Sequence, residues 1–150
     1  EKDNPLALTY HALGCSLVSR DSKNPVTQLG QVKKAIKLFD KAVKLAANKN
    51  DEWFIRYMRG NFFVCLPDTF KKRTEAENDF AFVLRHYNAD PSIEPYMCNG
   101  YFNLGEIEKS RGNIERAVSC WMRSVELNKK LSLSSKEAAE AEKRLALYAD

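Results

Sequence analysis

This 150-residue sequence has no long apolar run and no closely paired cysteines. No apolar stretch approaches the roughly 18 residues that a membrane-spanning helix needs, so we expect no insertion into a membrane. No C-x2-C pair is present, which argues against a zinc site. We expect small, buried, reduced thiols, which favour a cytoplasmic location. The first residue is Glu1 and not Met, so a targeting segment could have been removed before it. The four cysteines are Cys15, Cys65, Cys98 and Cys120.

The motifs of the common enzyme classes are also missing. The two histidines, His11 and His86, do not belong to an H-E-x-x-H metal motif. The sequence has no glycine-rich phosphate loop and no G-x-S-x-G turn. His11 and Cys15 are four residues apart and would share a helix face. Nothing in the sequence supplies the orienting group or the oxyanion site that a Cys–His pair needs. We therefore predict a protein that is not an enzyme and binds no cofactor or metal ion.

Tyr101 to Leu127 is the stretch with the clearest pattern. Gly112-Asn113 interrupts it and predicts a short turn between two helices. A connection of about four residues makes such helices pack antiparallel. Small residues lie where the helices must approach, and large residues lie beside them. The small residues are Gly105, Ala117 and Ser124, and the large ones are Tyr101, Leu104 and Trp121.

This order, Tyr101-x2-Leu104-Gly105 followed by Ala117-x3-Trp121, resembles the tetratricopeptide repeat pattern. Glu108 and Lys129 stand where that pattern has Tyr and Pro. One such hairpin cannot bury its own apolar face, so stacked neighbours are expected. The same offsets recur around Gly14 with Ala35-x3-Phe39, and in a poorer form around Gly60 with Ala76-x3-Phe80.

The resemblance implies an all-α fold of about seven helices, a right-handed superhelical stack of antiparallel hairpins. We predict a single domain, 1–150, with repeats at about 7–50, 51–90 and 98–130. Two inserted connections are expected at 19–30 and 67–73. A capping helix is expected at about 134–149, because Ser134-x2-Glu137 has the spacing of a capping box.

The resemblance also implies a non-catalytic adaptor that binds a peptide or protein segment in a concave groove lined by the first helix of each pair. Tyr57 and Phe102 would be good anchors, because aromatic side chains bury much area with few rotatable bonds. The alternative is that these aromatics pack the next layer or lie under the final helix. The groove positions implied by the resemblance are Leu8, His11, Cys15, Phe54, Tyr57, Asn61, Asn99, Phe102 and Glu106.

Two other functions stay open. Edge loops or a displaced capping helix could pair two copies, which would make the domain a self-association module. A lysine stripe could bind an anionic ligand or nucleic acid, because residues 1–50 hold nine Lys or Arg against four Asp or Glu. No aromatic residues interleave with the stripe to stack on bases, so we favour a solvated helix face and expect a protein partner. The stripe consists of Lys33, Lys37, Lys41 and Lys44.

Overall fold

The computed structural model describes residues 4–148, which form seven α-helices and two 3-10 helices with no β-strand among them. This confirms the prediction of an all-α fold of about seven helices. The ends of the predicted domain, 1–3 and 149–150, lie outside the described residues, as does the predicted end of the capping helix at 149. The elements are α1 (Pro5–Asp21), α2 (Pro25–Ala46), α3 (Glu52–Val64), η1 (Asp68–Phe70), α4 (Arg73–Ala89), η2 (Pro91–Ile93), α5 (Glu94–Ser110), α6 (Ile114–Lys130) and α7 (Lys136–Ala146).

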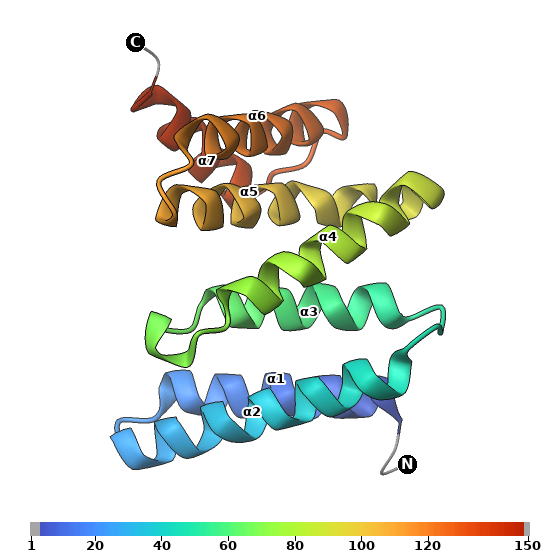
Figure 1. Cartoon of the computed structure of the whole chain (residues 1–150), viewed down its shortest axis with the longest axis vertical. Coiled ribbons are helices and arrows are strands. Elements are labelled where there is room, and N and C mark those ends of the chain that lie inside the picture. Colours follow the sequence, from blue (N-terminus) through green and yellow to red (C-terminus); the bar gives the residue numbers. More distant parts are fainter. Residues whose placement is uncertain (1–3, 149–150) are drawn as a thin grey trace. The chain divides into compact units, whose positions relative to one another are not determined.

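The helices form two compact units, Glu1–Phe62 and Phe63–Asp150, called unit 1 and unit 2 below. In unit 1, α1 and α2 lie side by side and antiparallel, joined by a short turn (Figure 1). The first part of α3 packs on both of them through two apolar clusters. One contains Ala12, Cys15, Ala35 and Phe39, with Met58 and Phe62 against it; the other contains Ala42, Val43, Ala46 and Ile55, with Leu6 and Leu8 against it.

The prediction of an inserted connection at 19–30 is wrong, because α1 continues to Asp21 and α2 begins at Pro25. The side chain of Asn24 caps the second helix. Its Oδ1 accepts hydrogen bonds from the backbone N–H of Val26 at 2.9 Å and of Thr27 at 3.3 Å. Pro25 occupies the first helical position, where a missing N–H costs nothing. Asn24-Pro25 is therefore a helix start rather than part of a loop.

The nine extra residues of the first hairpin are divided unequally between its two helices. Gly14 lies seven residues before the end of α1, whereas Gly105 lies five residues before the end of α5. Ala35 lies ten residues after the start of α2, whereas Ala117 lies three residues after the start of α6. The differences are two residues in α1 and seven in α2. Each residue rotates the helix by about 100°. Seven added residues in α2 therefore leave its motif facing nearly the same direction, whereas two added residues in α1 rotate its motif by about 200°.

This rotation explains which side of α1 packs on α2. Ala12, two residues before Gly14, is fully buried, as is Ala35. A Cβ added at Gly14 would meet nothing within 4 Å. Tyr10 is 61% exposed and Leu17 is 50% exposed. The α1 copy of the motif therefore faces outward, and the expectation that it packs like the motif in α5 is wrong.

In unit 2 the α5–α6 hairpin packs as its sequence predicts (Figure 1). Gly112 has a φ of 81° in the turn, which glycine adopts without strain. A Cβ added at Gly105 would lie 2.4 Å from Nε1 of Trp121, so only glycine fits against this fully buried indole. At the other end of the hairpin the Ser124 hydroxyl donates a hydrogen bond of 2.7 Å to the Cys98 carbonyl.

A connection and a short helix lie where the sequence predicts the second insertion and the capping helix. The connection at 67–73 is present and contains η1. The capping helix is α7, but its N-cap is Ser135 rather than Ser134. The Ser135 Oγ accepts from the Ala138 backbone N–H at 3.2 Å and donates to Glu137 at 3.0 Å. A spacing of two residues rather than three thus joins the serine to the glutamate. No helix within residues 4–148 is long and apolar enough to cross a membrane.

Candidate functional site

The groove residues predicted in the third repeat lie beside the capping helix. Asn99 donates to Glu137 of α7 at 3.5 Å, and Glu106 accepts from Nε of Arg144 at 3.2 Å. Phe102 packs against an apolar cluster that α7 shares through Ala141. Asn99, Phe102 and Glu106 are half-buried. The structure therefore brings these three residues together under α7, which is the alternative that the sequence left open.

A hollow of about 420 Å³ lies next to this contact and is called the α5 hollow. It takes one wall from α5 and the other from the end of α3 and the start of α4, all within unit 2. Its lining combines apolar side chains with two cations, a carboxylate and an amide, and these charged and amide side chains are called the rim below. It is lined by Val64, Cys65, Arg73, Asn103, Glu106, Ile107, Lys109 and Ser110.

Two of the three charged residues that line the α5 hollow are in ion pairs, and one is not. Glu106 is paired with Arg144, and Arg73 is paired with Asp68 at 2.5 Å. Among the described residues, Lys109 makes no ion pair and is half-buried. Because Glu106 and Arg73 each have a partner of opposite charge, Lys109 is left as the uncompensated charge of the described lining, and it favours an anionic group.

Cys65 lines the α5 hollow, and it contradicts the expectation that all four thiols are buried. The four thiols are free; Cys15 and Cys98 are buried, Cys120 is half-buried and Cys65 is exposed. Cys65 directly follows the end of α3. Desolvation raises its pKa, so this thiol is a weak nucleophile at neutral pH.

The groove residues predicted in unit 1 occupy different environments. Cys15 is 5% exposed inside an apolar cluster, and Leu8 packs against the neighbouring cluster. His11 is exposed, so the two members of the considered Cys–His pair face different surroundings. The three residues on α3 are half-buried, and the Phe54 ring meets the Trp53 ring edge-on at 5.8 Å. The α3 residues are Phe54, Tyr57 and Asn61.

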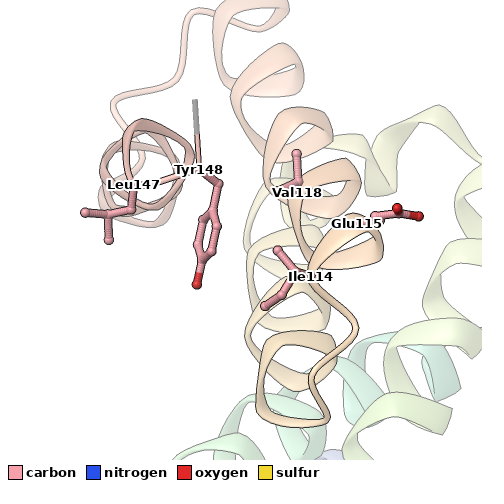
Figure 2. A pocket seen from close by; sticks show the side chains of 5 residues that line it. All are labelled: Ile114, Glu115, Val118, Leu147 and Tyr148. Atoms are coloured by element: carbon pink, nitrogen blue, oxygen red, sulfur yellow. The ribbon is translucent and has the colours of Figure 1, made fainter. Parts of the chain in front are cut away.

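A second hollow, of about 550 Å³, lies between the start of α6 and the residues that follow α7. Figure 2 shows Ile114 pointing toward the ring of Tyr148, whereas Glu115 and Leu147 point away from it. The Tyr148 ring stacks on the Trp121 indole at a centroid distance of 5.9 Å. This hollow is lined mostly by apolar side chains and could accept an apolar side chain.

A polar cluster that the sequence did not predict joins α4, α5 and α6. The Glu94 carboxylate accepts a hydrogen bond of 2.8 Å from the Tyr87 hydroxyl and another from Lys130. The bond from Lys130 holds the pKa of Glu94 below its ordinary value, and the bond to Glu94 raises the pKa of Tyr87. The members are 7 and 36 residues apart, so no local motif could have indicated them.

Within residues 4–148, no three His, Cys, Asp or Glu side chains gather closely enough to hold a metal ion. The lysine stripe of α2 lies on exposed residues, as a solvated helix face would. The stripe residues are Lys33, Lys37, Lys41 and Lys44.

Comparison with known proteins finds the tetratricopeptide repeat in two segments. The family model matches residues 27–49, which contain most of α2, and residues 99–131, which contain most of α5 and all of α6. No curated protein and no solved structure matches the chain significantly. The second segment is the hairpin in which the Gly105–Trp121 contact reproduces the packing that the sequence predicts.

Proposed function

Because this chain belongs to the tetratricopeptide repeat family, whose repeats generally mediate protein–protein interactions, we propose that it is a non-catalytic adaptor that binds a partner's segment on the groove side of α5. The family is generally a non-catalytic scaffold. The observation that supports the proposal is the α5 hollow, to whose lining Glu106 belongs, one of the groove residues that the resemblance implies.

The hollow suits one side chain and the backbone around it rather than a whole helix. Its volume of about 420 Å³ lies in the lower part of the range of small-ligand sites. Val64 and Ile107 offer apolar contact. The Asn103 side chain, whose Nδ2 donates to Oδ1 of Asn99, belongs to the rim and could also meet the backbone of an extended peptide.

The charge of the rim favours an acidic side chain in the partner. A carboxylate placed beside Lys109 would gain a charge-assisted hydrogen bond, which is about twice as strong as a neutral one. Glu106 would repel that carboxylate less than a free glutamate does, because Arg144 neutralises it. The proposed partner segment is therefore extended and carries an Asp or Glu next to a small apolar residue.

Unit 1 by itself offers further proposed contacts for a partner segment. His11, Tyr57 and Asn61 remain proposed contacts, with Phe54 beside them, because none of them lies in the core of unit 1. Cys15 and Leu8 are left out, because both pack in its apolar clusters.

The test is capture of partners from lysate by the wild type and by matched charge-reversal variants. Lys109→Glu reverses the charge at the rim of the α5 hollow. Arg116→Glu makes the same kind of change on the exposed face of α6, away from the hollow. We expect Lys109→Glu to lose the partner and Arg116→Glu to keep it, with the helicity of both unchanged by circular dichroism.

A peptide array then tests the chemistry of the captured segment. Replacing its acidic residue by the corresponding amide should weaken binding to the wild type about tenfold, the loss of one charge-assisted contact. If Lys109→Glu captures the same partner as strongly as the wild type, the α5 hollow is not the binding site.

A further inference from the structure

The outward face of α1 is the strongest feature that the proposed function does not use. Four exposed residues, Ala7, Tyr10, Gly14 and Leu17, follow the 3-4-3 spacing of a coiled-coil seam and are called the α1 seam. From Pro5 to Ser19, α1 contains no Lys, Arg, Asp or Glu. The seam is therefore an uncharged and exposed helix face, lined by small and large side chains in turn.

We propose that the α1 seam is a docking surface for the α1 seam of a second copy of this chain, with the two helices antiparallel. Two properties of the seam favour an identical partner. The seam carries no charge, so an identical surface meets no like charge and a partner of opposite charge is not required. It also alternates small and large side chains along the helix, so it is complementary to itself in one orientation.

The alternation selects the antiparallel orientation. In an antiparallel pair each first position of the 3-4 pattern faces a second position of the other helix. Tyr10 then lies opposite Gly14 of the second copy, and Leu17 lies opposite Ala7. Each large side chain meets a small one, and the operation is a two-fold axis, which closes the assembly at two copies. A parallel pair would place Tyr10 against Tyr10 and leave a gap between the two glycines.

Gly14 supplies the space that this contact needs. A Cβ at Gly14 would meet nothing within 4 Å inside the chain, so packing within the chain does not require a glycine there. Glycine costs a helix interior about 1 kcal/mol relative to alanine. Tyr10, which is 61% exposed, is the side chain that would fill the space above Gly14 of the second copy.

The contact is small, so the dimer is expected to be weak. A helix of 17 residues is about 25 Å long at ~1.5 Å per residue. One helix face of that length lies at the low end of the areas buried in specific interfaces. We therefore expect a dissociation constant on the order of 10 to 100 µM. The contact leaves the α5 hollow unused, so the dimer and the proposed adaptor function can fail independently.

Sedimentation velocity between about 1 and 300 µM measures this equilibrium directly, because the range brackets the expected constant. Gly14→Leu fills the space that Tyr10 of the second copy would occupy. Gly30→Leu is its control, because Gly30 is also helical with nothing within 4 Å of an added Cβ. Leu17→Arg puts a charge in the seam, and Val26→Arg is its control at a residue that is 80% exposed outside the seam.

We expect the wild type to form a dimer, both seam variants to weaken it at least about tenfold, and both controls to dimerise like the wild type. A wild type that stays monomeric over the whole range overturns the proposal and assigns the seam to a different protein. A seam variant that dimerises as tightly as the wild type also overturns it.

Disulfide cross-linking tests the orientation. In a chain with Cys65→Ser and Cys120→Ser, an equimolar mixture of Ala7→Cys and Leu17→Cys chains should form a mixed disulfide dimer. Either chain alone should not cross-link, because its own cysteines would lie about 15 Å apart along the two helices. Cross-linking of Ala7→Cys chains with each other would contradict the antiparallel pair.

Discussion

The sharpest test of the fold is a single substitution, glycine to alanine, made at two positions with the same sequence motif. Gly105 and Gly14 both follow Tyr-x2-Leu, yet they have opposite surroundings. A Cβ at Gly105 would lie 2.4 Å from Nε1 and 2.5 Å from Cδ1 of Trp121, and 3.1 Å from the Ala117 carbonyl oxygen. A Cβ at Gly14 would enter open space.

The magnitudes follow from these distances. Overpacking a well-packed core costs typically about 1–3 kcal/mol, and the upper part of that range is expected at Gly105 because the indole is fully buried. Replacing a helical glycine by alanine gains about 1 kcal/mol at either site. The expected net effects are a loss of about 1–2 kcal/mol for Gly105→Ala and a gain of about 1 kcal/mol for Gly14→Ala.

Thermal and urea unfolding measure both effects, at a concentration where the chain is monomeric. In a chain of this size, 1 kcal/mol shifts the melting temperature by roughly 2–4 °C. Gly105→Ala should therefore melt several degrees below Gly14→Ala. Adding Trp121→Phe to Gly105→Ala should recover part of the loss, because the smaller ring vacates the space beside the new methyl group. A Gly105→Ala variant as stable as Gly14→Ala would refute the close contact between Gly105 and Trp121.

The remaining predictions concern a helix cap and an ion pair. Ser135→Ala should lower the free energy of unfolding by about 1 kcal/mol and Ser134→Ala should leave it nearly unchanged, because only the Ser135 hydroxyl accepts from the Ala138 N–H. Urea titration of both variants decides which serine is the cap; equal losses would show that neither is the sole cap. The lowered pKa of Glu94 stabilises the fold above the ordinary carboxyl pKa of about 4.3, and this contribution is lost as the pH falls through the lowered value. Glu94→Gln should therefore be less stable at pH 7 and should lose less stability on acidification to pH 3, and parallel losses for both proteins would contradict the role of its ion pair with Lys130.

The sequence predicted the helices and the α5–α6 hairpin because both depend on local patterns. A short turn joins the helix of Gly105 to the helix of Ala117 and Trp121, so the spacing of these residues in the sequence determines how they pack. That Gly14 faces outward could not be predicted from the spacing of the motif. Its orientation depends on how nine extra residues are divided between α1 and α2. The signal that could have located the turn was Asn24-Pro25, a cap followed by a first-turn proline.

The candidate site was less accessible from the sequence than the fold. That α7 would cover Asn99, Phe102 and Glu106 depends on a contact across 38 residues, made by Arg144 with Glu106 and by Glu137 with Asn99. The α5 hollow depends on where α3 ends, since Val64 and Cys65 form one of its walls. Such contacts are set by tertiary packing rather than by any local pattern.

The unequal lengthening of α1 and α2 has a consequence for how repeat proteins diversify. An insertion of a few residues near a hairpin turn acts as a rotation, and its size modulo one helical turn decides which face is displayed. The motif in α1 has the same residues as the motif in α5, but its glycine faces solvent in α1 and the core in α5. A duplicated repeat can therefore acquire a new surface without a substitution in that motif.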